Sequence, residues 1–248
     1  AYLHLSTLAD PDSADAALRV AIMARRLSEY KAAEVWFESA RRLARKGRDV
    51  RGVALAELGL GVLWMRRGEF RRGRRFNLLG LKSAQRAALR DVEASARWNL
   101  FGCAVGSGDS REAWIQLGEA VRIIERGSAR FVNLSHDAAY WLMTQGLFKE
   151  ALTVFSAVLP HVHAAPARAL ILSNIVRSAG GAGERAAYES ALMEVQDAVE
   201  RGSSGEYVAN VHLNVGYGAW ALGHVEAADQ AASAALAAAT ARNEVDTG

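Results

Sequence analysis

Residues 213–228 read LNVGYGAWALGHVEAA, and the fold is inferred outward from this stretch. Gly216 lies inside an apolar run with helical spacing, and Gly223 stands where that run stops. Because small residues let two helix backbones approach closely, the stretch predicts a tightly packed helical hairpin. A second helical run follows the turn, with apolar or small residues at Val225, Ala228, Ala232 and Ala235.

The same arrangement recurs along the chain. Each hairpin turn is followed, five, nine and twelve residues later, by mostly small or apolar residues, such as Ala33, Phe37 and Ala40 after Ser28. The pattern is weaker in the third hairpin and weakest in the fifth. A near-constant step of this length indicates an array of stacked repeats. The turn residues are Ser28, Gly68, Gly108, Gly146, Gly183 and Gly223, which gives steps of 40, 40, 38, 37 and 40 residues.

These residues resemble the tetratricopeptide repeat (TPR), and the resemblance covers roughly residues 14–240. The step exceeds the usual length of about 34 residues, which adds about one and a half helical turns per unit. Such long-period arrays are similar to those of large LuxR-family regulators, kinesin light chains and Rap-type peptide sensors. The resemblance implies an all-α, right-handed superhelical solenoid of about six TPR-like helix pairs.

Composition agrees with a helical fold, since the chain has only three prolines and is rich in Ala, Leu, Arg and Glu. We predict one superhelical domain over residues 1–248. Since no Met begins the sequence, it is either processed or a fragment of a longer protein, and we expect a fragment because repeat arrays often stand beside other domains. Residues 1–13 are predicted to end a preceding element or to form a cap, and residues 180–183 to form a loose loop. After a first hairpin over 14–46, the predicted helix pairs are 51–66 with 69–88, 91–106 with 109–126, 129–145 with 147–163, 165–180 with 184–201, and 205–222 with 224–242.

The sequence offers little for chemistry, so we expect no enzyme, no catalytic residue, no cofactor and no metal. His161 and His163 are two residues apart, which places their rings on different sides of a helix. The glycine-rich stretches GSGDS and GGAGER are not followed by the Gly-Lys-Ser/Thr of a phosphate loop. A single cysteine, Cys103, fits a reducing compartment, and the absence of a long uncharged apolar run argues against a membrane span. We expect a cytoplasmic protein.

Charge is unevenly distributed between the two halves of the chain. Up to Arg97 there are 20 basic and 11 acidic residues, and beyond it 10 basic and 16 acidic, so net charges of +9 and −6 sum to the +3 of the chain. The densest basic cluster could hold phosphates or an acidic peptide, because guanidinium groups bind both. The alternative is a solvated face neutralised by Glu69 and nearby acids. The cluster comprises Arg66, Arg67, Arg71, Arg72, Arg74 and Arg75.

The resemblance to TPR arrays implies that the first helix of each pair lines an inner groove. One register of that helix reads Arg19, Gly59, Asn99, Asp137, Asn174 and Asn214. In peptide-binding TPR arrays, asparagines at this position clamp the backbone of an extended peptide, since a carboxamide offers both donors and an acceptor. We therefore predict partner-binding residues at Asn99, Asp137, Asn174 and Asn214. The alternative is that each amide satisfies a neighbouring helix end.

One helical turn further along, Tyr140, Arg177 and Tyr217 are predicted to supply side-chain pockets, because aromatic residues and arginine are common interface anchors. The leading function is a protein- or peptide-binding scaffold, or the sensor module of a bacterial-type regulator. The first alternative is nucleic-acid binding through the basic N-terminal half. The second is self-association to a homo-oligomer through terminal helices, with the alanine-rich residues 226–241 as the contact.

Overall fold

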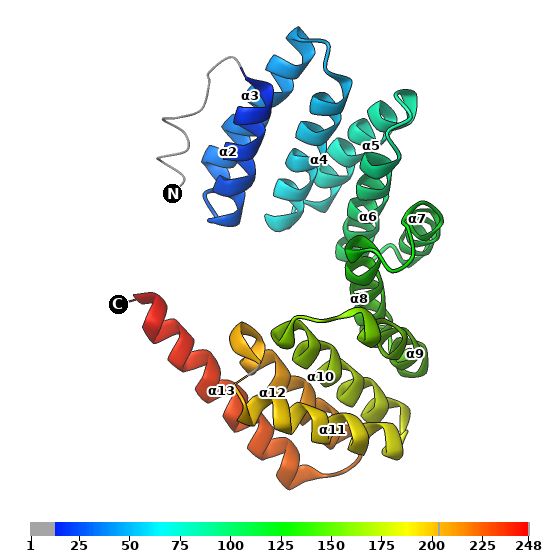
Figure 1. Ribbon diagram of the computed structural model, residues 1–248, viewed down its shortest axis with the longest axis vertical. Coiled ribbons are helices and arrows are strands. Elements are labelled where there is room, and N and C mark those ends of the chain that lie inside the picture. The colour runs from blue at the N-terminus through cyan, green and yellow to red at the C-terminus, as the bar shows by residue number, and fades with distance from the viewer. Residues whose placement is uncertain (1–12, 203, 248) are drawn as a thin grey trace. The chain divides into compact units, whose positions relative to one another are not determined.

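The computed structural model describes residues 13–202 and 204–247, with side chains up to residue 242. The preceding element or cap predicted for residues 1–13 therefore lies, except for Ser13, outside the described residues. Within them the chain forms α-helices joined by short connections, with two short 3-10 helices and no strand (Figure 1). The chain divides into two compact units, which are unit 1 (residues 1–125) and unit 2 (residues 126–248).

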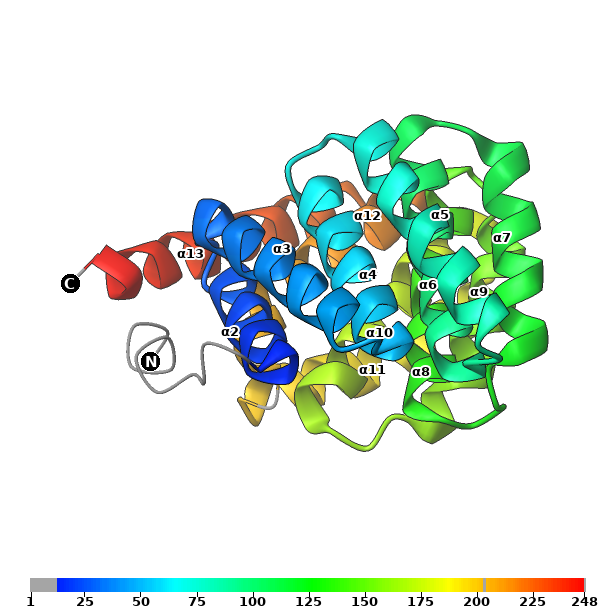
Figure 2. The same ribbon diagram turned by 90° about the horizontal axis from the view of Figure 1, so that it is seen from above.

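Unit 1 contains α2 (Ala14–Arg26), α3 (Tyr30–Lys46), α4 (Val50–Arg66), α5 (Phe70–Arg86), α6 (Arg90–Ser107) and α7 (Ser110–Ile123). Unit 2 contains α8 (Ala129–Thr144), α9 (Phe148–Val158), α10 (Ala165–Ala182), α11 (Arg185–Glu200), α12 (Val208–Ala221) and α13 (Val225–Thr247). Consecutive helices pack as antiparallel pairs, as α2 with α3 and α4 with α5 illustrate from above in Figure 2. The predicted all-α architecture of six helix pairs is confirmed.

The hairpin turns explain the repeat. Every predicted turn residue adopts a positive φ, between 60° at Ser28 and 80° at Gly223. This left-handed conformation is tolerated best by glycine, and it ends a helix by directing the chain back along the helix surface. The next amide then donates to a carbonyl five residues earlier, as from Glu69 to Trp64 and from His224 to Ala219, both at 2.9 Å. Glycine therefore recurs because each hairpin uses the same turn.

Glycines also mark close helix crossings. A methyl group added at Gly73 would lie 2.9 Å from the carbonyl oxygen of Gly61, and one at Gly216 would lie 3.3 Å from that of Ala228. The close packing predicted around Gly216 is confirmed, and Gly73 marks a second crossing of the same kind. A tighter crossing joins α10 to α12, where a methyl group at Gly180 would lie 2.4 Å from the Gly218 oxygen. Residues 180–182 are consequently helical, and the prediction of a loose loop there is wrong.

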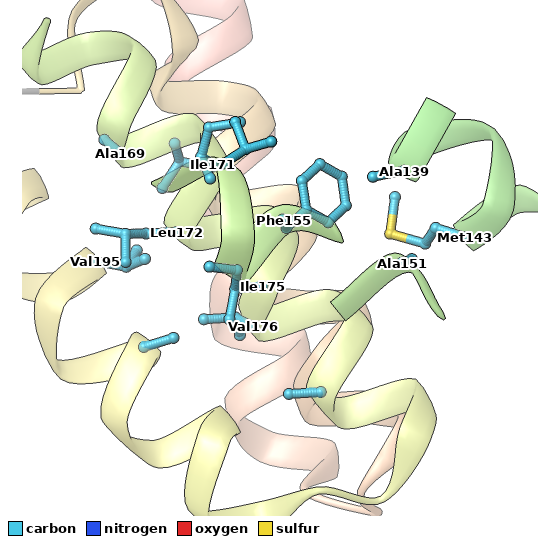
Figure 3. Close-up of a cluster of buried hydrophobic side chains, with 14 of the residues drawn as sticks. Ala139, Met143, Ala151, Phe155, Ala169, Ile171, Leu172, Ile175, Val176 and Val195 are labelled. Carbon is cyan, nitrogen blue, oxygen red and sulfur yellow. The ribbon is translucent and has the colours of Figure 1, made fainter. Parts of the chain in front are cut away.

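Aliphatic and aromatic side chains fill the space between the helices of each unit. Unit 1 buries Phe37 and Leu60, and in unit 2 Phe155 of α9 belongs to the same buried cluster as Leu172 and Val176 of α10 (Figure 3). None of the described helices has the length and apolarity needed to cross a bilayer. The first helices of successive pairs, α10 and α12, pack against each other in unit 2, which brings their polar residues together.

Candidate partner-binding site

The predicted amides Asn174 and Asn214 meet between α10 and α12. Asn214 donates from Nδ2 to the Asn174 Oδ1 at 2.8 Å and to the Ser173 Oγ at 3.1 Å. Both amides are buried, at 1% exposure for Asn174 and 5% for Asn214. Their hydrogen bonds join two repeats to each other, so neither amide faces solvent to clamp a peptide backbone. The register argument brought these residues together correctly but assigned them to the wrong environment.

His136 on α8 continues this amide network. The Asn174 Nδ2 lies 3.3 Å from the His136 Nε2, and the His136 Nδ1 lies 3.4 Å from the Asp137 Oδ1. An amide nitrogen can donate to Nε2 only when the imidazole is neutral and carries its proton on Nδ1. That proton then faces the Asp137 carboxylate, which orients the ring. The Phe155 ring packs edge-on against the imidazole, with the ring centroids 5.9 Å apart.

Asn99 takes part in a separate polar contact in unit 1. Its Nδ2 donates to the Asn77 Oδ1 at 3.1 Å, and Asn77 is fully buried on α5. Asn77 donates in turn to the Cys103 Sγ at 3.5 Å. Burial raises the pKa of the Cys103 thiol to about 11, which keeps it protonated and unreactive at neutral pH. Asn99 therefore lies in unit 1, whereas the other residues predicted to bind the partner lie in unit 2.

In the predicted side-chain row the two tyrosines are exposed and Arg177 is half-buried, in contrast to the buried amides. Tyr140 and Tyr217 are each 46% exposed, and they occupy equivalent positions on α8 and α12. Arg177 holds the same position on α10, where its guanidinium stacks 4.2 Å above the Tyr217 ring and donates to the Asn214 Oδ1 at 3.4 Å. Within the described chain Arg177 forms no ion pair. The row Tyr140, Arg177 and Tyr217 thus places two aromatic rings and one unneutralised cation on three successive first helices.

An apolar hollow of about 370 Å³ lies between α12 and α13, beside this row. Tyr217 lines it, and Trp220, 70% exposed, forms another part of its wall. Gly180 on α10, equivalent to Trp220, is covered by α12, whereas no described helix covers Trp220. Sequence reasoning named Tyr217 but missed the hollow. The repeat spacing could have indicated it, because adding 40 to the numbers of the α10 residues that α12 covers gives the residues of α12 that line the hollow. Its lining is Leu213, Gly216, Tyr217, Trp220, Ala228 and Ala232.

The predicted basic cluster is divided in the structure. Arg67 and Arg72 stack on the Trp64 ring, with guanidinium carbons 4.5 and 3.4 Å from its centroid. Both also pair with Glu34, at 3.5 and 3.7 Å. Arg74 lies 3.6 Å from Glu112. Internal carboxylates thus neutralise half of the cluster, whereas the exposed Arg66, Arg71 and Arg75 form no ion pair within the described residues.

The remaining candidates for chemistry stand apart. His161 and His163 are exposed on a 3-10 helix and the connection after it. Among the described residues, no group of three His, Cys, Asp or Glu side chains is placed to hold a metal ion.

Neither a family model nor a curated protein sequence matches this chain. Solved structures do resemble it. BtubC (BKLC) from P. vanneervenii is 17% identical, with a TM-score of 0.69 over 81% of this chain and 87% of its own. The TPR-like repeats of a putative kinesin light chain from Podosopora anserina are 13% identical, with a TM-score of 0.62 over 77% and 97%. A Rap protein complexed with competence and sporulation factor is 10% identical, with a TM-score of 0.63 over 90% and 74%. The chain thus has a TPR-like helical-repeat fold.

Proposed function

We propose that the chain is a non-enzymatic interaction scaffold, and that unit 2 holds an extended segment of a partner protein. The segment lies along the row Tyr140, Arg177 and Tyr217 and reaches the hollow between α12 and α13. The single observation that carries this proposal is the row itself, in which three anchors share one register and one of them, Tyr217, also lines the hollow. Helical repeats favour such extended contacts because each unit adds an equivalent surface.

The chemistry of the surface defines the partner segment. Arg177 has guanidinium donors left over after its contact with Asn214, and these suit a carboxylate of the partner. The hollow is almost entirely apolar and accepts an aliphatic or aromatic side chain. We therefore infer a segment with an acidic residue followed, within a few positions, by a large apolar residue. Tyrosine and arginine are also the residue types that contribute most to interface affinity.

The buried amides have a supporting role in this proposal. Asn214 accepts a hydrogen bond from Arg177 and donates to Asn174, so it fixes the arginine above the Tyr217 ring. An arginine held in one rotamer loses less conformational entropy when it binds. Asn174 and Asn214, which sequence reasoning assigned to peptide binding, thus position the binding arginine and do not touch the partner.

The Rap protein complexed with competence and sporulation factor supports a binding role for this fold. By that analogy we propose that the chain serves a regulator as its sensor or scaffold part, in the cytoplasm. The analogy concerns the fold alone, so the partner must be found by experiment.

The test is a search for peptide ligands. A display library of random twelve-residue peptides is selected against the chain, and affinities are measured by fluorescence anisotropy. Selected peptides should carry the acidic and apolar pair, and Arg177→Ala or Tyr217→Ala should weaken each by about tenfold or more. Two exposed residues of α11 provide matched controls, as Arg185→Ala and Met193→Ala should leave affinity unchanged. Peptides that bind both sets of variants equally would contradict the proposal.

The two alternatives predict different results. If the basic half binds nucleic acid, random oligonucleotides bind in a steeply salt-dependent way, and neutralising Arg66, Arg71 and Arg75 abolishes binding. If α13 mediates self-association, the sedimentation coefficient rises with concentration and falls in Leu236→Lys, because Leu236 is 70% exposed on this helix. Salt-sensitive oligonucleotide binding without any selected peptide would favour nucleic acid as the partner.

A further inference from the structure

Three arginines of unit 1 converge on one polar hollow of about 340 Å³. Arg25 and Arg26 come from the last turn of α2, and Arg66 from the last turn of α4. Arg26 and Arg66 are 40 residues apart, so the repeat itself brings two equivalent side chains to neighbouring helix ends. Ser28, from the turn between α2 and α3, and Tyr30, the first residue of α3, complete the lining, and both side chains carry a hydroxyl group.

No carboxylate neutralises these arginines within the described residues. Glu34 pairs with Arg67 and Arg72 instead, and Glu29 does not line the hollow. The Arg25 Nε is buried without a hydrogen-bond partner. Burial and the charges of Arg66 and Arg26 lower the pKa of the Arg25 guanidinium, because its charged form is poorly solvated and repelled. Within the described residues, no carboxylate and no hydrogen-bond acceptor compensates this group.

Helix capping does not account for the cluster. Basic residues are favoured at helix C-termini, where they can bond to the last carbonyl groups. Here the turn amides already occupy those carbonyls, since Glu29 donates to Ala24 and Glu69 to Trp64, both at 2.9 Å. The arginines are therefore left with donors that face a polar hollow, and the missing component is an anion.

We propose that this hollow is a binding site for a phosphate group, either inorganic phosphate or the phosphate of a small phosphomonoester. Three cations exceed what one carboxylate would neutralise, and they match a dianion with several acceptor oxygens. The two hydroxyl groups donate to the same oxygens. The volume exceeds that of a phosphate ion, so part of a carrier molecule fits beside it. This site is independent of the peptide site proposed in unit 2.

The test follows the Arg25 Nε–H signal by nuclear magnetic resonance, while inorganic phosphate replaces chloride at constant ionic strength. A saturable shift of this signal is expected. A parallel titration with glycerol phosphate shows whether inorganic phosphate or a phosphomonoester is preferred, because the preferred ligand saturates the signal at the lower concentration. Arg66→Gln and Arg26→Gln should each weaken binding by about tenfold. Arg71→Gln and Arg75→Gln, which alter exposed arginines outside the hollow, are the controls.

The unfolding temperature gives a second measurement of phosphate binding. Arg25→Gln should lose the increase in unfolding temperature that phosphate gives the unaltered chain, with circular dichroism showing that its helices remain. An Arg25 signal that does not respond to phosphate would overturn the site. Equal losses in the control variants would overturn it as well, since they would show general attraction to a basic surface.

Discussion

The two units build the same helix pairs around different buried polar groups. Unit 1 buries a carboxyl group, Glu57, at 2% exposure, with Arg45 at 3.1 Å and the Ser83 hydroxyl at 3.3 Å. The buried polar side chains of unit 2, among the described residues, are uncharged serines and asparagines. A buried charge needs a partner and responds to pH, whereas a buried amide needs only its hydrogen bonds. Equivalent folds can therefore have different sensitivities to pH.

The units also differ in where their helices approach most closely. In unit 1 the contact of Gly61 with Gly73 lies within one hairpin, between α4 and α5. In unit 2 the contact of Gly180 with Gly218 lies between successive hairpins, at α10 and α12. The closest approach of a backbone atom to a helical glycine thus lies inside a hairpin in unit 1 and between two hairpins in unit 2.

The largest expected effect is at the α10–α12 crossing. Gly180→Ala places a methyl group 2.4 Å from a backbone oxygen that cannot move alone, and we expect a loss of about 3 kcal/mol of stability in urea unfolding. Gly118→Ala is the matched control, because no atom lies within 4 Å of its added methyl group. That control should gain stability, about 0.5–1 kcal/mol, from helix propensity. A neutral Gly180→Ala would contradict the close crossing.

Inside unit 1 the corresponding substitution should be rescued by a second one. Gly61→Ala places a methyl group 2.3 Å from the Asn77 Oδ1, and we expect a loss of about 2 kcal/mol. Asn77→Ala removes that obstacle, so the two losses should fall short of additivity by about 1 kcal/mol in a double-mutant cycle. Additive losses would show that the Gly61 methyl group clashes with something other than this amide.

The amide network of unit 2 gives the next effect. Asn214→Ala leaves the Asn174 and Ser173 groups without their partner, at an expected cost of about 1–3 kcal/mol. Hydrogen exchange should quicken in α10 and α12. Asn99→Ala, at a half-buried amide of unit 1, should cost less and leave exchange in unit 2 unchanged. If hydrogen exchange in α10 and α12 is unchanged in Asn214→Ala, Asn214 does not join the two helices, and partner binding would again be the better explanation for it.

The smallest expected effect is on the pH dependence of stability, and it distinguishes unit 1 from unit 2 most directly. Burial raises the pKa of the Glu57 carboxyl, although the charge of Arg45 and the Ser83 hydrogen bond oppose the shift. The folded state therefore binds the proton more strongly, and its added stability, complete below the ordinary pKa, is lost as pH rises through the raised pKa. Glu57→Gln should remove this slope in urea unfolding followed over pH. Parallel stability curves for both proteins would contradict the raised pKa.

Sequence reasoning located the repeats because each turn imposes a local requirement. A positive φ selects glycine at five of the six turns, and the residues that follow must pack, so both signals survive without knowledge of the tertiary structure. Tyr140 and Tyr217 are exposed, as the sequence analysis requires, and their role in binding stays a prediction. The predicted exposure of the amides was wrong because they lie beside the contact between first helices. Successive residues of a helix are rotated by about 100°, so exposure there changes from one residue to the next.

The basic residues illustrate a second limit. Arg66 and Arg67 are adjacent in sequence, yet one lines the polar hollow with Arg25 and the other stacks on Trp64. A run of charges along a helix is distributed around it, so proximity in sequence does not make one surface. The partners that decide the role of each arginine come from helices 30 to 40 residues away, as Glu34 does for Arg67. Only the repeat spacing of Arg26 and Arg66 could have indicated that the two meet.

The uncovered face of α12 has a consequence for the binding role proposed above. In a linear array each layer is stabilised by its neighbours, so stability depends on how many interfaces are filled. A partner whose side chain occupies the hollow beside Trp220 takes the place that α12 itself takes against α10, and it acts as one more layer. If the proposed partner binds there, we expect it to stiffen the stack cooperatively from α13 back toward α8, without any hinge or change of fold.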